Sequence, residues 1–230
     1  MTDRISNSAF LRSHLLWPVA GMAIVLVLLA VLDADHRIAQ AVFFDGLTQR
    51  WIGRENFWAT EVLHRGGRNV MRLIGLLAII AWAASYRSVR LKPHRRSLGY
   101  LALCMAIVPL TVGALKEATN VDCPWDMQGF GGDRPVVAWY QDRPDDLPRA
   151  ACFPGAHSSS AFALFALYFL WLGSNPVRAR WALSGVLILG SAFSLAQQSR
   201  GAHFISDDLT SALIAWVICL FLYLRILRRA

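Results

Sequence analysis

Apolar and polar residues fall into long blocks along the chain, with six apolar runs separated by polar segments. The runs lie at about residues 16–33, 70–86, 97–116, 157–173, 181–199 and 208–225. A helix needs ~20 mostly apolar residues to cross a bilayer, and each run approaches that length once its flanks are counted. The pattern predicts an all-α integral membrane protein built as a bundle of six transmembrane helices. Residues 1–230 are expected to form a single membrane-embedded domain.

The first two runs need separate interpretation. The first has no small-residue cleavage site and is followed at once by Asp33, which favours a retained helix over a signal peptide. The second has a short apolar core with Arg72 at its edge. If the second run did not cross the membrane, five spans would place the two ends of the chain on opposite sides.

Two longer polar segments, residues 34–69 and 117–156, separate apolar runs. The first carries Trp51, Phe57 and Trp58 among polar residues, which predicts short interfacial helices with these rings at headgroup depth. The second is rich in proline, glycine and aspartate, which predicts one long ordered loop.

Charge predicts the orientation of the bundle. The chain carries 23 Lys and Arg against 15 Asp and Glu, a formal net charge of +8. With six spans, more than half of the basic residues share one side with both chain ends, and Asp3 is the only acid there. The positive-inside rule makes that side cytoplasmic, with both termini, and makes the two long segments periplasmic. The short loops favour a multi-pass protein of a bacterial inner (cytoplasmic) membrane. Nucleic acid is not expected as a partner, because the basic residues are spread over several loops.

The four cysteines fall into two pairs. Cys104 and Cys219 lie within apolar runs and are interpreted as buried small hydrophobic residues. Cys123 and Cys152 lie in the long periplasmic segment, where an oxidising compartment allows them to form a disulfide. The chain-entropy model assigns such a bridge about 3 to 4 kcal/mol. Two free thiols and, less readily, a zinc site are the alternatives.

Two histidines lie just outside apolar runs. His157 precedes the fourth run, and His203 precedes the sixth, with Asp207 four positions further on. One imidazole can attack phosphorus, a carboxylate can orient it, and the other imidazole can protonate the leaving group. The set therefore points to phosphoryl transfer at a membrane face, although interfacial histidines also occur as simple helix caps.

Three short motifs follow one another in a fixed order. Lys116 precedes Cys-Pro at 123–124, Pro-Gly-Ala-His occupies 154–157, and His203 is followed by Asp207. This order resembles the signature of the type 2 phosphatidic acid phosphatase superfamily, which runs Lys-x6-Arg-Pro, Pro-Ser-Gly-His and Ser-Arg-x5-His-x3-Asp. The family includes lipid phosphatases and vanadium haloperoxidases, and its membrane members have six helical spans with the site on the outer face. The resemblance covers roughly residues 60–220, and the Cys-Pro-Trp-Asp element is similar to a bacterial branch acting on lipid A and related glycolipid phosphates.

The chain departs from this signature at several positions. Cys123 and Gln197 stand where the family has phosphate-binding arginines, and Gly155-Ala156 replaces Ser-Gly. Arg200, about one helical turn after Gln197, and Arg134 are the predicted replacements, with Arg149 a weaker candidate. Ser158 is expected to supply a hydroxyl in place of the missing motif serine.

The resemblance implies a role for each matching residue. His203 would form a phosphohistidine, Asp207 would accept a hydrogen bond from its other ring nitrogen, and His157 would protonate the leaving oxygen. Lys116 and the backbone N–H groups of residues 155–157 would neutralise the phosphate. Water would then hydrolyse the intermediate without a metal or other cofactor. Asp208 is interpreted as a helix N-terminal charge.

A second group, His64 and Arg68, ends the first periplasmic segment. An imidazole beside a guanidinium there can contact an anionic headgroup, but plain interfacial anchoring is the simpler interpretation.

The predicted function is hydrolysis of a membrane lipid phosphate or pyrophosphate, with undecaprenyl pyrophosphate, lipid A and phosphatidylglycerol phosphate as candidates. A lipid phosphotransferase using the same phosphohistidine is one alternative. A non-catalytic relative that binds lipid phosphate is another, motivated by the two missing arginines. A transporter is disfavoured, because no run carries an ionisable residue near its middle. The sequence does not indicate an oligomeric state.

Overall fold

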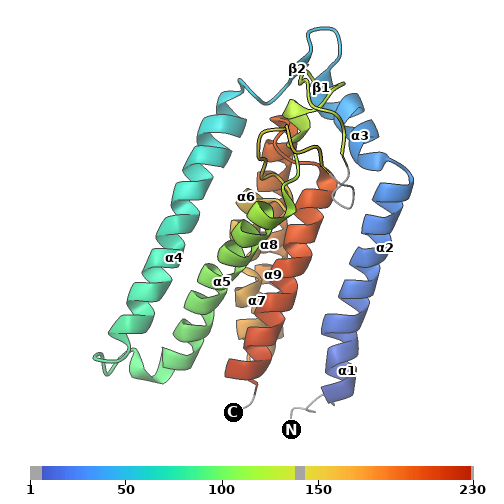
Figure 1. The fold of residues 1–230 in the computed structure, drawn as a ribbon. Coiled ribbons are helices and arrows are strands. Elements are labelled where there is room, and N and C mark those ends of the chain that lie inside the picture. Colours follow the sequence, from blue (N-terminus) through green and yellow to red (C-terminus); the bar gives the residue numbers. More distant parts are fainter. Residues whose placement is uncertain (1–6, 138–142, 229–230) are drawn as a thin grey trace.

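The computed structural model describes residues 7–137 and 143–228 and shows long helices beneath a layer of short elements at one end (Figure 1). The first long helical stretch consists of α1 (Asn7–Leu11), a π-helical turn (Arg12–Leu16) and α2 (Trp17–Val31). The remaining long helices are α4 (Gly67–Ala84), α5 (Arg95–Thr119), α8 (Pro176–Ser199) and α9 (Ile205–Ile226). Two shorter ones, α6 (Ala156–Phe162) and α7 (Phe165–Leu172), follow each other closely.

Five helical stretches in the described part of the chain are long and apolar enough to cross a membrane. They are Asn7–Val31, Trp58–Ala84, Lys92–Asp126, Pro176–Ser199 and Ile205–Ile226. The fourth apolar run forms the shorter apolar stretch Ala156–Leu172, composed of α6 and α7. The mostly helical membrane fold expected from the sequence is therefore confirmed, and a sixth crossing by α6 and α7 stays a prediction.

The second helical stretch is longer than the sequence indicated. A π-helical segment, Trp58–Gly66, runs directly into α4, so the helix begins well before the predicted start at residue 70. A hydrophobicity count misses this start of the helix because it contains the polar residues Glu61, His64 and Arg65.

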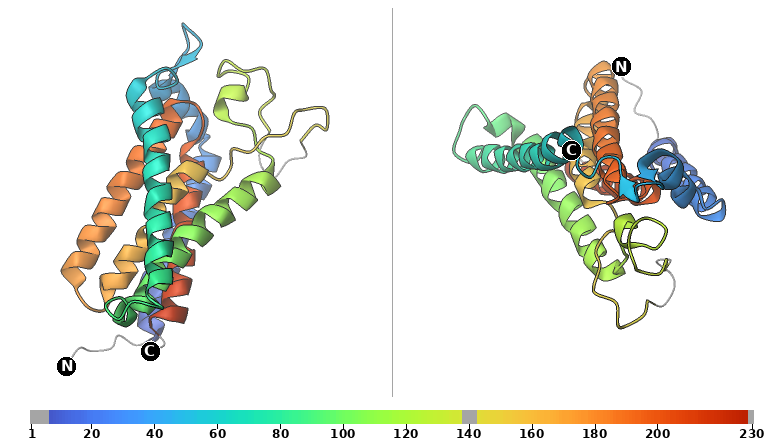
Figure 2. Two further views of the ribbon diagram at one scale, coloured as in Figure 1. Left: turned by 90° about the vertical axis from the view of Figure 1, so that its left-hand side faces the viewer. Right: turned by 90° about the horizontal axis from the view of Figure 1, so that it is seen from above.

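Figure 1 shows which segments lie at each end of the bundle. The start of α1 and the end of α9 lie at the same end, together with the connections 85–94 and 173–175. The short strands and the loop segments 120–137 and 143–155 lie at the opposite end (Figures 1 and 2). The predicted cytoplasmic termini themselves fall outside the described residues.

Helices α5 to α9 enclose the apolar core. Tyr100, Val108, Phe169 and Cys219 are among its fully buried residues, and the Tyr100 hydroxyl donates to the Cys219 carbonyl over 3.1 Å. Cys104 is also buried and free. Both intramembrane cysteines thus pack as small hydrophobic residues, as predicted.

A small aromatic core organises the outer layer. It follows α3 (Ala34–Ile38) and a π-helical turn (Ala39–Phe43), where β1 (Phe44–Asp45) pairs antiparallel with β2 (Arg50–Trp51). Trp51 is only 4 % exposed, stacks on Phe130 and donates from Nε1 to its carbonyl over 3.2 Å. Trp51 is therefore buried within the outer layer rather than exposed to lipid headgroups, whereas Phe57 and Trp58 are exposed.

The second outer segment is held by a disulfide and an ion cluster. Cys123 and Cys152 form a disulfide with their Cα atoms 5.1 Å apart. Next to it the buried Asp122 carboxylate binds Arg134 and Arg143, the latter with an Nη2–Oδ1 distance of 2.9 Å. A short 3-10 turn, Pro124–Asp126, lies between these residues in sequence.

Candidate active site

The outer layer fixes the loop that carries His203 between α8 and α9. The backbone N–H of Trp125 donates to the carbonyl of Gly201 over 2.9 Å, and the N–H of Ser206 donates to Asp35 over 3.1 Å. Gly201 has a φ of +76°, and a Cβ there would lie 2.4 Å from the Trp51 ring. Only glycine suits this turn, because both its backbone conformation and its contact exclude a side chain.

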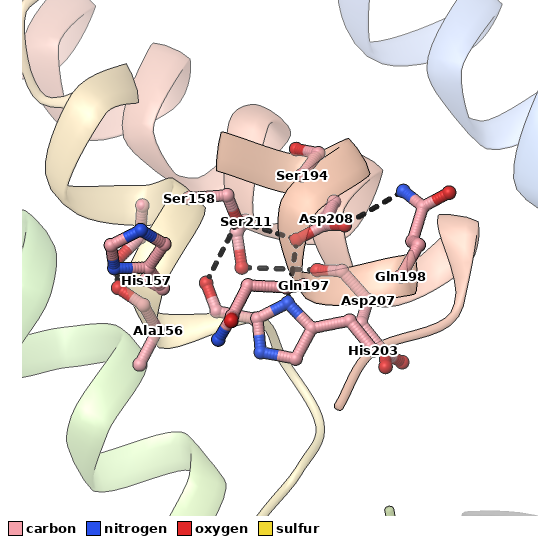
Figure 3. A network of polar contacts seen from close by, with 12 residues as sticks. Ala156, His157, Ser158, Ser194, Gln197, Gln198, His203, Asp207, Asp208 and Ser211 are labelled. Carbon is pink, nitrogen blue, oxygen red and sulfur yellow. Dashed lines mark hydrogen bonds and ion pairs between the residues drawn. The ribbon is translucent and has the colours of Figure 1, made fainter. Parts of the chain in front are cut away.

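His203 pairs with a carboxylate at the start of α9 (Figure 3). Its Nδ1 lies 2.8 Å from Oδ1 of Asp208, and both side chains are buried. Two further side chains hold the carboxylate: Gln198 donates from Nε2 to Oδ2 over 2.9 Å, and the Ser158 hydroxyl lies 2.7 Å from Oδ1. The buried carboxylate therefore has a hydrogen-bond partner on each oxygen.

Asp207 does not contact His203, contrary to the sequence-based expectation. Its carboxylate accepts the backbone N–H of Phe204 over 2.8 Å, so it caps the first turn of α9. Its carbonyl accepts the N–H of Gly155 over 3.0 Å. Consecutive side chains on a helix point in different directions, so only one of the two aspartates can face His203. The roles predicted for Asp207 and Asp208 are thus exchanged.

Gly155 lies directly against the His203–Asp208 pair. A Cβ at this position would lie 2.6 Å from Oδ1 of Asp208 and 2.9 Å from Nδ1 of His203. Because its N–H is already bonded to Asp207, Gly155 does not supply the predicted phosphate contact. The Ser158 hydroxyl is likewise directed to Asp208 rather than to a phosphate. Ala156, in contrast, lines the cavity described below.

His157 lies on α6 with its ring packed between two others. It stacks on Phe193 with ring centroids 4.5 Å apart and meets His64 edge-on at 4.9 Å. Nε2 of His157 lies 3.1 Å from the Leu63 carbonyl. A carbonyl only accepts, so Nε2 carries a proton, and Nδ1 is the ring nitrogen left for chemistry.

A cavity of about 590 Å³ connects these groups to the space between α4 and α5. Its polar wall contains His64, Arg68, Arg72, Lys116, His157, Gln197 and His203. Its apolar wall contains Met71, Gly75, Leu76, Ile79, Met105 and Pro109. The cavity therefore has the form needed to hold an anionic head and an attached apolar chain.

The predicted phosphate ligands divide between the cavity and the outer loop. Lys116 lines the cavity, and so do His64 and Arg68, which the sequence offered as headgroup contacts. Arg200 lies behind the wall, where it donates from Nη1 to the Oε1 of Gln197. Burial lowers the pKa of the Arg200 guanidinium, and the charges of Arg54, Arg65 and Arg68 lower it further.

Two other predicted arginines do not reach the cavity wall. Arg134 binds Asp122, a hydrogen bond that raises the pKa of its guanidinium, and it lies 3.7 Å from Asp126. Arg149 donates to the Glu117 carbonyl and is largely exposed. Arg134 is therefore a loop-ordering residue rather than the predicted replacement for a missing phosphate ligand.

Sequence reasoning missed Gln198 and assigned Asp208 too small a part. Gln198 lies beside Gln197 in the last turn of α8, and both glutamines are buried. Two adjacent glutamines at the end of a membrane helix indicate a nearby polar site, because buried polar groups need hydrogen-bond partners.

Comparison with known proteins gave one family match. The profile described as the PAP2 superfamily matches residues 97–230, which contain Lys116, His157, His203 and both aspartates. No curated protein and no solved structure matches the chain significantly.

Proposed function

Because the chain belongs to the PAP2 superfamily, we propose that it is a membrane lipid phosphatase that forms a phosphohistidine at His203. The superfamily supports a phosphoric ester hydrolase as the reaction class. The proposed substrate is a lipid phosphate or pyrophosphate, such as undecaprenyl pyrophosphate, lipid A or phosphatidylglycerol phosphate. One observation carries the proposal: a single cavity joins the His203 imidazole to an apolar wall between α4 and α5.

The nucleophile is Nε2 of His203. With Nδ1–H donating to Asp208, Nε2 carries the lone pair that attacks phosphorus. Asp208 stabilises the positive charge that develops on the ring, and Gln198 and Ser158 hold its carboxylate in place. Gly155 supports this arrangement by leaving room for the pair.

The leaving oxygen receives its proton from Nδ1 of His157. In the imidazolium form, Nε2–H still donates to the Leu63 carbonyl while Nδ1–H is free to protonate the leaving group. Lys116 in the cavity wall neutralises the charge spread over the equatorial oxygens. Water then cleaves the phosphorus–nitrogen bond and releases phosphate.

The apolar wall supports a lipid as the proposed substrate. An acyl or prenyl chain between α4 and α5 would bury apolar surface against Leu76, Ile79 and Met105, at ~25 cal/mol per Å² removed from water. The site also lies at the end of the bundle opposite the basic connection 85–94. The positive-inside rule then supports a periplasmic site in a bacterial inner membrane.

The test is phosphate release by the detergent-purified protein from undecaprenyl pyrophosphate, lipid A, phosphatidic acid and phosphatidylglycerol phosphate, with and without chelator. Chelator-resistant release from at least one lipid is expected, with a loss of at least ~10³-fold in His203→Ala. Acid-labile, base-stable labelling of wild-type protein by a ³²P-substrate would identify the phosphohistidine. Release that survives in His203→Ala would contradict the proposal.

Two related activities are separate outcomes of the same assay. Label moving to a second lipid, rather than to water, would identify a phosphotransferase. Binding without release of phosphate would identify a non-catalytic lipid-phosphate-binding protein.

A further inference from the structure

One face of the second helical stretch changes from polar to apolar along its length. His64, Arg68 and Arg72 follow at intervals of four residues and all line the cavity. Leu76 and Ile79 continue the same wall. Residues four apart lie on one helix face, so the wall orders a charged head before an apolar tail.

In the part of the chain that the structure describes, these three side chains have no hydrogen-bond or ion-pair partner. His64 has a buried Nδ1 without a hydrogen-bond partner, and neither Arg68 nor Arg72 forms an ion pair there. Arg65, the neighbour on another face, is by contrast paired with Glu61 at 2.8 Å. A cavity wall with two unpaired guanidinium groups and an unpartnered imidazole nitrogen is arranged for an anion that comes from outside the chain.

The wall formed by these three residues lies on the leaving-group side of the site. The His64 ring meets the ring of His157, the proposed acid, with centroids 4.9 Å apart. An alcohol leaving group would have no use for two guanidinium charges beyond the acid. A leaving group that is itself a phosphate would need them, because charge builds up on it as the bond breaks.

We propose that His64, Arg68 and Arg72 form a second phosphate subsite, and that the preferred substrate is a lipid diphosphate. This inference rests on the proposed phosphatase reaction. Nε2 of His203 bonds to the terminal phosphorus while the bridging P–O bond breaks. The electron pair goes to the bridging oxygen, and the lipid monophosphate leaves with its charge at the second subsite. Water hydrolyses the phosphohistidine to inorganic phosphate.

The test compares binding of farnesyl diphosphate and farnesyl phosphate to the full-length His203→Ala protein by calorimetry in detergent. The diphosphate is expected to bind at least ~10-fold more tightly, since charge-assisted hydrogen bonds contribute most of the difference. Adding Arg68→Ala and Arg72→Ala should reduce the ratio to within about 2-fold while monophosphate binding persists, which also reports correct folding. Arg65→Ala is the matched control and should keep the ratio.

Equal affinities for the two ligands, or equal weakening of both by the arginine substitutions, would overturn the inference and assign the arginines to the surrounding lipid headgroups. Because the His203→Ala background has no proposed nucleophile, the binding ratio is readable even if wild-type protein releases no phosphate. Failure of the proposed hydrolysis is thus distinguishable from failure of the second subsite.

Discussion

At the scale of single residues, two adjacent carboxylates have different structural roles. Asp208 pairs with His203 at 2.8 Å, whereas Asp207 accepts the N–H of Phe204 at 2.8 Å and caps α9. The sequence could predict that an aspartate follows His203 at the start of a helix. It could not predict which one turns toward the ring, because this depends on the direction in which the loop at Gly201 enters the helix.

Substituting the two aspartates in turn separates the two roles. Asp208→Asn is expected to lower kcat by ~10² to 10⁴-fold, because the amide no longer holds the proper tautomer or stabilises the charged ring. Asp207→Asn is expected to cost about 1 kcal/mol of stability by weakening the cap, with kcat reduced less than about 5-fold. Steady-state kinetics and thermal unfolding of both purified variants provide the measurement. The reverse order of effects on kcat would restore Asp207 as the partner of His203.

At the scale of elements, the stretch from Trp58 to Ala84 illustrates the limit of hydrophobicity counting. The apolar run from residue 70 predicted a helix, but the segment before it contains Glu61, His64 and Arg65 and resembled an interfacial segment. In the helix His64 lines the cavity, whereas Glu61 and Arg65 pair with each other on another face. Summing hydrophobicity over all residues fails to detect a helix whose polar and apolar residues lie on different faces.

The apolar wall of the same element makes a prediction about chain length. Gly75→Leu is expected to fill the space near Met105, because the glycine now leaves its would-be Cβ 3.9 Å from that side chain. Hydrolysis of a long-chain lipid phosphate should fall about 10-fold or more through KM, while that of a short, water-soluble phosphate ester should change less than about 2-fold. The assay is phosphate release from both substrates.

Gly185→Leu is the control for this prediction, since a side chain at that position of α8 meets open space. A similar loss on the short and the long substrate in Gly75→Leu would show that no chain lies between α4 and α5.

At the scale of the whole molecule, the outer layer joins segments that are distant in sequence. Trp51 stacks on Phe130, and Gly53 donates to Ser199 over 2.8 Å. Strands of two residues have no periodicity to read, so the hairpin was missed, and Arg134 was misplaced because Asp122 competes for it. The helical bundle and the cavity-lining residues that match the family motifs were predictable from the sequence, whereas contacts between loops were not.

The disulfide of the outer layer allows two tests, one of the stability of the protein and one of the predicted periplasmic side of this layer. Cys123→Ser with Cys152→Ser is expected to lower stability by about 3 kcal/mol and the apparent Tm by several degrees. Thermal unfolding in detergent measures the change, and wild-type protein with reductant serves as the control. Free thiols at both positions in protein isolated under alkylating conditions would contradict a periplasmic outer layer.

His157 lies on α6 and His203 on the loop before α9, yet short hydrogen-bonded links join the segments that carry them. Gly155 donates to the Asp207 carbonyl over 3.0 Å, and Ser158 reaches Asp208 over 2.7 Å. Groups connected in this way do not contribute independently, so their energetic effects on turnover are not additive. Once one histidine is lost, the other contributes little to turnover, so selection no longer preserves it. The pair is therefore expected to be kept or abandoned in evolution as one inherited unit.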